Sequence, residues 1–343
     1  MINGHGNNIY QYDRDIIEAD FSSNIAFNNH SDEILSFLSG NMDSLRNYPD
    51  PAARRLTEKI ATFHGVDTKN ITVANGSAEV FYMVAHYLTM IASPTKCRTI
   101  ITTPSFSEYE DSCKLHGHEI SYVELRDIKN IDTTNFDSLW LASPNNPDGY
   151  RVYAEDIYDL AARNRECLII LDRAYNALST DGEVCCKLPD NVLLVESFTK
   201  YYGIPGLRLG YIVGAEDIIS SITPMRPPWS VNSLSIVAGE YILDNMEMLQ
   251  IDLEELIGES HYLQESINEI EGLRVVRSNC NFFLVEIEGG ILASELYEYL
   301  LHKHGLLVRD CSNFRDLGSN FIRIAAQSRL QNDKLINALR GWR

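Results

Sequence analysis

The sequence has little that would place it in a membrane or outside the cell. No apolar run approaches the roughly 20 residues that a membrane-spanning helix needs, and the polar stretch from Met1 to Tyr10 is unlike a secretory signal. The seven cysteines contain no C-x-x-C pair and no regular framework. This pattern argues against a structural zinc and predicts reduced thiols in a cytoplasmic protein. We therefore expect no bound metal.

Basic residues are also scarce. The chain has 48 acidic against 29 basic residues and a formal net charge of −19. Such an acidic surface argues against nucleic acid or an anionic membrane as a partner. It also means that an anionic substrate would depend on positive charge concentrated in one place, which gives weight to the few arginines that lie inside motifs.

Short apolar runs alternate with helix-length segments as far as about residue 240. Runs bounded by turn residues and separated in this way predict a buried, mostly parallel sheet with helices on both faces. We therefore predict one large α/β/α domain around a seven-stranded sheet. The expected strands are 70–74, 98–102, 120–123, 138–142, 167–171, 192–197 and 209–213, and the expected helices are 78–91, 106–116, 154–165 and 234–244.

The pattern changes after this point. A long acidic stretch, 246–270, predicts a helix and leads into expected strands at 273–276, 281–286, 306–309 and 321–325. These elements suffice for a small α+β domain, since a chain of 343 residues exceeds what one core usually supports. We expect an N-terminal arm and a segment joining the small domain at 1–40, a large domain at 41–240, and the small domain at 241–343.

Lys200 is the most informative residue. It follows the expected strand 192–197, stands beside the hydroxyl residues Ser197 and Thr199, and precedes Arg208 by eight positions. A lysine in this setting suits an amine that holds an aldehyde cofactor as a Schiff base, with the hydroxyls and the guanidinium on its phosphate. Pyridoxal 5'-phosphate (PLP) is such a cofactor. A solvated lysine after a strand is the alternative.

Polar side chains follow the other expected strands. Asp172 comes directly after 167–171, where ligands of open α/β sheets bind. It could keep a pyridine nitrogen protonated, and Tyr175 could hydrogen-bond the phenolic oxygen of the same ring. An aspartate at a helix N-cap is the alternative. Asn146, in Pro144-Asn145-Asn146-Pro147, could donate to that oxygen or belong to an ordinary turn.

Two further segments precede helices. Gly76-Ser77-Ala78 opens the helix after the first strand, and free N–H groups at a helix start bind anions such as a phosphate. Tyr109 lies one turn into the next helix and could stack on a pyridine ring, although most aromatic residues at such positions belong to the core. Each signal is weak alone, and their order along the chain gives them weight together.

In this order the segments resemble the fold-type I PLP enzymes of the class I/II aminotransferase superfamily over nearly the whole chain. The resemblance implies that Lys200 forms the Schiff base and moves protons, while Asp172 pairs with the pyridine nitrogen. It implies that Tyr175 and Asn146 bind the phenolate oxygen and that Tyr109 stacks on the ring. The implied phosphate contacts are Ser77, Ala78, Ser197, Thr199 and Arg208. Arg323 would bind the substrate α-carboxylate, and Tyr48 would reach into the partner's site of a homodimer.

Within the superfamily, the chain resembles threonine-phosphate decarboxylases of cobalamin synthesis and histidinol-phosphate aminotransferases. Segments 4–9, 21–25 and 228–234 favour the decarboxylases. The implied substrate is a phosphorylated amino acid or amine, with His5 and Asn24 near its end. A decarboxylase would release CO2 from L-threonine O-3-phosphate, whereas an aminotransferase would pass the amino group to 2-oxoglutarate. A PLP-binding protein without turnover is a third interpretation, which the charge and the lack of a preceding DNA-binding module oppose.

Five positions depart from the family pattern. Asn7 replaces a glycine of the arm, and Ala26-Phe27 replaces the usual Asn-Pro. Asp148 stands where the turn usually has threonine, and Arg173 stands where a glutamate usually follows the aspartate. We expect Asp148 and Arg173 to pair with each other, which would preserve the site.

Overall fold

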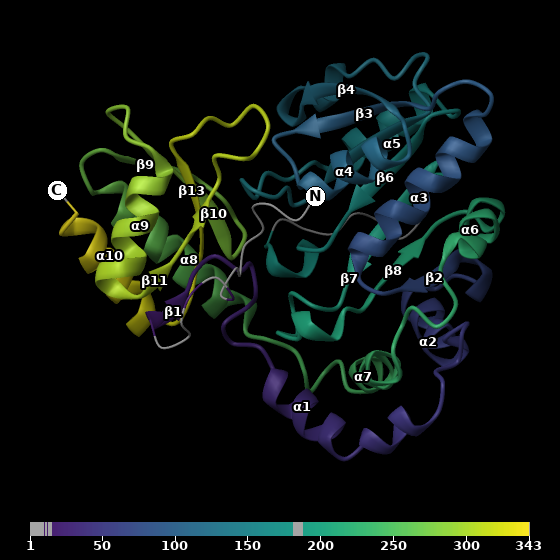
Figure 1. The fold of residues 1–343 in the computed structure, drawn as a ribbon, viewed down its shortest axis with the longest axis horizontal. Coiled ribbons are helices and arrows are strands. Elements are labelled where there is room, and N and C mark those ends of the chain that lie inside the picture. Colours follow the sequence, from purple (N-terminus) through teal and green to yellow (C-terminus); the bar gives the residue numbers. More distant parts are fainter. Residues whose placement is uncertain (1–9, 11, 13–15, 181–187, 343) are drawn as a thin grey trace.

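The computed structural model describes residues 10, 12, 16–180 and 188–342. Within the expected N-terminal segment 1–40, His5 and Asn7 lie outside these residues. Over the described ranges, no helix combines the length and the apolar character that crossing a bilayer requires. Figure 1 shows two parts side by side, one built around a large sheet and one around a small sheet.

The larger part contains a seven-stranded sheet in the order β2-β8-β7-β6-β5-β3-β4. Among these strands β8 runs antiparallel to both neighbours, and the other pairs are parallel. The predicted α/β class and mostly parallel seven-stranded sheet are therefore confirmed. The strands are β2 (Ile71–Ala74), β3 (Arg98–Thr103), β4 (Glu119–Glu124), β5 (Ser138–Ala142), β6 (Leu168–Asp172), β7 (Val192–Ser197) and β8 (Gly210–Val213).

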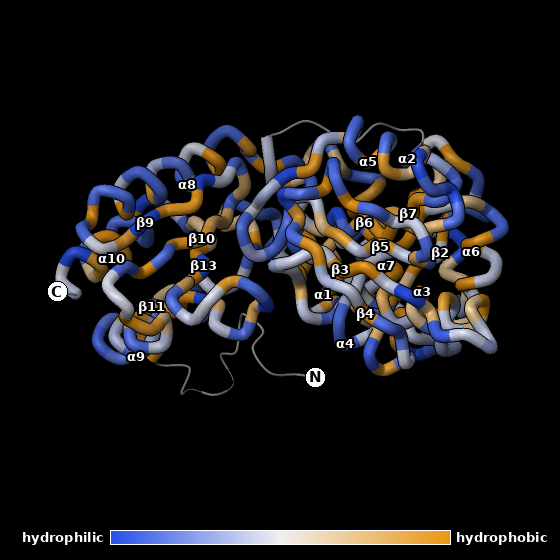
Figure 2. Tube along the Cα trace, turned by 90° about the horizontal axis from the view of Figure 1, so that it is seen from above, coloured by the Kyte–Doolittle hydropathy of each residue, from blue (hydrophilic) through white to orange (hydrophobic). Residues whose placement is uncertain are grey.

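Helices cover both faces of this sheet because successive side chains of a buried strand point to opposite faces. In β5, Leu139 and Leu141 pack into one hydrophobic cluster and Trp140 into another. The first cluster includes residues from α1 (Ser31–Ser39), α2 (Arg54–His64), α5 (Ala154–Arg163) and α7 (Ser233–Asp244). The second includes residues from α3 (Ser77–Ala92), α4 (Ser107–Leu115) and α6 (Glu216–Ile222). Figure 2 shows apolar residues concentrated along the central strands.

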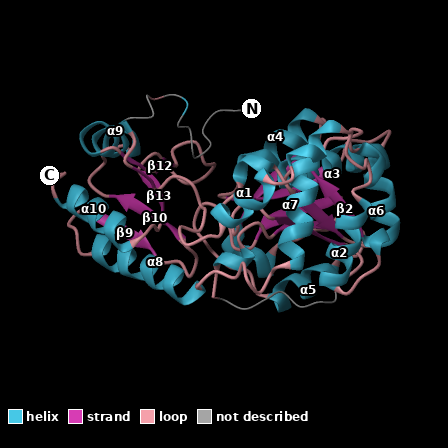
Figure 3. Cartoon of the chain, turned by 90° about the horizontal axis from the view of Figure 1, so that it is seen from below, coloured by secondary structure: helices cyan, strands magenta, loops and turns pink. Residues whose placement is uncertain are grey.

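The smaller part is built on a four-stranded antiparallel sheet in the order β12-β13-β10-β9. A separate parallel pair, β1 with β11, attaches the N-terminal segment at Ala19 and Asp20 to Leu306 and Leu307. Figure 3 shows the helices of this part beside the sheet. The elements are β1 (Ala19–Asp20), α8 (Leu253–Asn268), β9 (Leu273–Val276), β10 (Phe282–Ile287), α9 (Ala293–His304), β11 (Leu306–Leu307), β12 (Arg309–Asp310), β13 (Phe321–Ala325) and α10 (Arg329–Arg340).

One expected helix is shorter than the sequence predicted. Helix α8 begins at Leu253, not at 246, because the side chain of Asp252 caps it by accepting a hydrogen bond from the backbone N–H of Glu255 at 2.9 Å. The preceding residues form turns that bury Leu249 and Ile251. Short 3-10 turns complete the described chain: η3 (Met42–Arg46), η4 (Thr68–Asn70), η5 (Leu125–Asn130), η6 (Asn176–Leu178), η7 (Pro205–Leu207) and η8 (Thr223–Met225).

Candidate active site

Asp172 lies buried at the carboxyl end of β6, on the edge where β5 and β7 also end. The Tyr109 hydroxyl donates to its Oδ2 at 2.6 Å, and the backbone N–H of Ala174 donates to its Oδ1 at 2.9 Å. Burial raises the pKa of Asp172, while these two hydrogen bonds and the charge of Lys200 act in the opposite direction. A carboxylate placed in this way gains from any cationic N–H group that comes within reach.

Lys200 follows β7 on the same edge. Burial lowers the pKa of its amine to about 8, and the positive charges of Arg323 and Arg208 contribute in the same direction, against the carboxylates of Asp172 and Asp20. Among the described residues Lys200 has no ion-pair partner. A sizeable neutral fraction is therefore present near neutral pH, and the neutral amine is the form that attacks a carbonyl group.

An anion cradle lies between Lys200 and the start of α3. Gly76 has a φ of +82°, and a Cβ built on it would lie 2.6 Å from Nη2 of Arg208. A Cβ on Gly210 would lie 2.6 Å from the backbone nitrogen of Ser77. Both glycines are therefore needed to let the Arg208 guanidinium and strand β8 approach the N-terminus of α3. Nearby, the hydroxyls of Ser197 and Thr199 lie 2.9 Å apart.

This cradle fits the phosphate of PLP. The N–H groups of Ser77 and Ala78 belong to the first turn of a 16-residue helix, whose dipole favours an anion. Arg208 is exposed, has a φ of +56° and makes no ion pair among the described residues. In a chain with a net charge of −19, an arginine without an ion-pair partner, held in left-handed backbone against a helix start, suits an anion. The structure brings Ser77, Ala78 and Arg208 together at this point.

Arg323 joins the two parts of the molecule at the same edge. It lies on β13, is 5% exposed, donates to the Asn146 side-chain oxygen through Nη1, and donates to the Ser22 carbonyl through Nη2 at 2.6 Å. Its buried Nε has no hydrogen-bond partner in the described chain. Because the oxygen of Asn146 accepts from Arg323, Asn146 has N–H groups to offer a ligand. Asn24, two residues after Ser22, is also buried. Neither atom of its side-chain amide makes a hydrogen bond to another described residue.

Arg309 is a candidate that the sequence interpretation missed. It stands opposite Arg323 in the β12–β13 pair and is 8% exposed. Its Nη2 donates to the Asn313 side-chain oxygen at 2.7 Å, and its guanidinium lies 5.4 Å from the centre of the Phe314 ring. Neither arginine forms an ion pair among the described residues. The two buried guanidiniums therefore concentrate positive charge on neighbouring strands. The signal available in the sequence was an arginine at the end of a buried apolar strand.

Tyr109 does not take the position that the resemblance implied. Its side chain is 1% exposed, with its ring edge-to-face against Phe81 at 4.9 Å and Phe106 at 5.9 Å. The ring therefore has no face left for stacking, and its hydroxyl supports Asp172 instead. Phe106, at the start of the same helix, is only half-buried. Phe106 is thus the aromatic residue of this segment that keeps exposed surface.

The expected pairing of Asp148 with Arg173 is also wrong. Arg173 faces Glu196 on the next strand, with Nε 3.2 Å from Oε1. Asp148 accepts from the Asn145 side chain at 2.8 Å and lies 3.3 Å from Nη2 of Arg126. Asp148 therefore stabilises the turn that carries Asn146, whereas Arg173 pairs across β6 and β7.

Of the remaining predicted residues, Tyr175 lies within electrostatic reach of Asp172 and Arg323, whereas Tyr48 lies on the surface. Tyr175 is half-buried, three residues beyond Asp172, with its ring 4.8 Å from that of Phe282. Burial raises the pKa of its hydroxyl, so that it stays protonated as a hydrogen-bond donor. Tyr48 is 84% exposed on the surface, with its ring 5.3 Å from that of Trp229.

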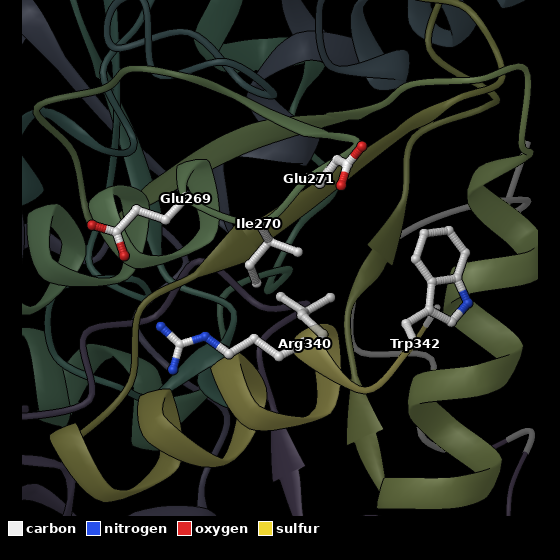
Figure 4. A pocket seen from close by; sticks show the side chains of 6 residues that line it. Glu269, Ile270, Glu271, Arg340 and Trp342 are labelled. Carbon is white, nitrogen blue, oxygen red and sulfur yellow. The ribbon is translucent and has the colours of Figure 1, made fainter.

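A separate hollow of about 490 Å³ lies at the ends of α8 and α10. Its lining residues are Glu269, Ile270, Glu271, Leu339, Arg340 and Trp342. Figure 4 shows Ile270 between Glu269 and Glu271, with Arg340 below it and the Trp342 ring to the right. None of the residues at the sheet edge lines this hollow, so it is not part of the candidate site.

Comparisons with known proteins show the family and the fold. A sequence model of the family described as aminotransferase class I and II matches residues 11–339. The chain is 31% identical to a threonine-phosphate decarboxylase of Salmonella typhimurium over 94% of this chain and 90% of that protein. It is 32% identical to a histidinol-phosphate aminotransferase of Clostridium novyi over 86% and 83%. The crystal structure of L-threonine-O-3-phosphate decarboxylase from Porphyromonas gingivalis superposes with a TM-score of 0.89 at 33% identity, covering 94% and 98%.

Proposed function

The chain belongs to the class I and II aminotransferase family, and we propose that within this family it decarboxylates L-threonine O-3-phosphate, releasing CO2 and aminopropanol phosphate. Family membership makes the protein an enzyme and removes the interpretation of a PLP-binding protein without turnover. The observation that carries the proposal is the pair Arg323 and Arg309, two buried guanidiniums on adjacent strands. L-Threonine O-3-phosphate carries both a carboxylate and a phosphate, which fits two such guanidiniums.

Enzymes of this family depend on PLP, and we propose that this chain binds it at the edge of the seven-stranded sheet. Ser77, Ala78, Ser197, Thr199 and Arg208 would hold its phosphate. Asp172 would keep its ring nitrogen protonated, with Tyr175 and Asn146 donating to the ring oxygen. When bound, PLP withdraws electrons from the α-carbon of an amine joined to it.

The protein's own groups would then bind, orient and move protons. Arg323 would take the α-carboxylate and Arg309 the phosphate, so that these two contacts set which bond at the α-carbon is aligned for cleavage. Lys200, with a pKa of about 8, can exchange a proton near neutral pH and would deliver one to the α-carbon after CO2 leaves. We also propose a homodimer in which Tyr48 reaches the partner's site, and His5 as a further contact at the substrate end.

A histidinol-phosphate type of aminotransferase is the second candidate, because a relative with that name is 32% identical. A paired turnover assay on PLP-loaded protein separates the two. We expect CO2 from L-threonine O-3-phosphate without any added keto acid. In the second tube, histidinol phosphate with 2-oxoglutarate should yield no glutamate. If glutamate formed and no CO2 was released, the protein would be an aminotransferase and the proposed decarboxylase activity would be wrong.

The support that Tyr109 gives to Asp172 makes a graded prediction. Tyr109→Phe removes a donor to a charged acceptor, and such a bond is worth enough to lower kcat by about tenfold. Because the lost bond holds the pKa of Asp172 down, the acidic limb of the kcat–pH profile should move to higher pH. The matched control is Tyr82→Phe. This substitution removes a 2.9 Å hydrogen bond from Tyr82 on α3 to Glu108 on α4, the helix that also carries Tyr109. An unchanged pH profile in Tyr109→Phe would contradict the role.

A further inference from the structure

The loop between β12 and β13 crosses from the four-stranded part to helix α4 of the seven-stranded part. Arg315, in this loop, donates from Nε to Oε2 of Glu110 at 3.0 Å and from Nη2 to Oε1 at 2.7 Å. Its guanidinium also lies 4.0 Å from the centre of the Tyr122 ring on β4. Figure 1 shows the loop in yellow, reaching from beside β13 toward β4. We call the Arg315–Glu110 pair the clasp.

Glu110 is a strong anchor for this contact. Although burial raises its pKa, hydrogen bonds from Arg315, Lys114 and Tyr122 together hold that pKa at about 2. The carboxylate therefore stays charged at any working pH. Exposed ion pairs usually contribute little, but here the fork of an arginine meets both oxygens of a carboxylate that is only 19% exposed.

Residues of the same loop also contact the side chain of Arg309 on β12. Asn313 accepts from the Arg309 guanidinium, and Phe314 packs against it, one residue before Arg315. Asn313 and Phe314, which contact the Arg309 guanidinium, are therefore the two residues that directly precede Arg315, the residue bound to α4. On α4 itself, Glu110 follows Tyr109, which supports Asp172.

We propose that Arg315 is a positioning residue for substrate recognition: through the clasp it sets the loop that orients Arg309, and thereby the distance between the substrate's phosphate site and the cofactor site. This inference rests on the proposed function for the identity of the anion that Arg309 binds. The clasp itself, as a restraint on residues 311–317, does not depend on that identity.

The test uses Arg315→Gln and Glu110→Gln in the PLP-loaded enzyme. The matched control is Arg329→Gln, since Arg329 makes the same type of contact within the four-stranded part: Nε lies 3.0 Å from both Glu259 oxygens, and the guanidinium lies 3.7 Å from the Tyr262 ring centre. Two quantities are measured: hydrogen exchange of the amides in 311–317, and kcat and KM for L-threonine O-3-phosphate beside L-threonine.

We expect faster exchange in 311–317 for both clasp variants and a KM for L-threonine O-3-phosphate raised about fivefold, the factor at the upper end for an ion pair of this exposure. The kcat and the KM for L-threonine should change less than twofold, and Arg315→Lys should restore part of the loss. The control should leave both the exchange in 311–317 and the KM unchanged.

Other outcomes separate the possible failures. Unchanged exchange in the clasp variants would overturn the clasp. Faster exchange with an unchanged KM would overturn the positioning of Arg309 while leaving the restraint. If the wild-type protein turned over neither substrate, the proposed function would fail, and the exchange measurement would still decide whether Arg315 restrains the loop.

Discussion

Replacing Lys200 with alanine should lower turnover by about a thousandfold or more, the range seen when a positioned acid–base group is removed. Lys200 is the amine next to Asp172 at the edge of the sheet, and its pKa of about 8 lets it act both as a nucleophile toward an aldehyde and as a proton carrier. Turnover is measured at saturating PLP, and PLP binding is followed separately by equilibrium dialysis.

The anion cradle does not include Lys200, so the alanine variant should still bind PLP. It should lack the visible absorbance band of a lysine-bound cofactor. Lys69→Ala is the control, since Lys69 is an exposed lysine paired with Glu216 at 2.9 Å. In the wild-type protein, the rate of covalent loading should rise with pH and level off above about pH 8, because only the neutral amine reacts. If Lys200→Ala kept its turnover within tenfold of the wild type, Lys200 would have no catalytic role.

The strands were predictable because each one is a local pattern of apolar residues between turn signals. Runs such as 138–142 and 273–276 have the observed bounds of β5 and β9. The start of α8 did not follow from the acidic composition of 246–270, which continues on both sides of the cap residue Asp252. The structure buries Leu249 and Ile251 in the turn before that cap. A stretch of helix-favouring residues can therefore be longer than the helix that forms, because tertiary packing overrides local propensity.

The sequence did not reveal the surroundings of a side chain where these depend on neighbours that are distant in the sequence. Tyr109 was expected to stack, but Phe81 and Trp140 surround its ring, and only the packing of α3 and β5 reveals this. Arg309 gained its significance from its register opposite Arg323, which no local motif encodes. The placement of Ser77, Arg208 and Lys200 at one edge followed from the sequence, because each belongs to a short segment at a strand end, where topology alone brings them together. Their roles stay a prediction.

Asp172→Asn should act in opposite directions on activity and on stability. Asparagine has the same shape but cannot balance a protonated ring nitrogen, so kcat should fall by about a hundred- to a thousandfold, as when one preorganised electrostatic group is removed. Burial raises the pKa of Asp172, which means that the fold holds its charge at a cost. The neutral variant avoids that cost, so the Tm of the PLP-free protein should be unchanged or higher.

The control for this substitution is Asp148→Asn, because Asp148 is similarly buried and burial also raises its pKa. It accepts from Asn145 and pairs with Arg126 away from Asp172, so its loss should lower kcat far less than the loss of Asp172 does. Thermal unfolding of the PLP-free variants is measured beside kcat. If Asp172→Asn lost activity together with a lower Tm, the carboxylate would be a structural anchor for Tyr109 and Ala174. Lost activity in an equally or more stable protein is the result that only a functional charge explains, because the fold gains nothing from keeping that charge.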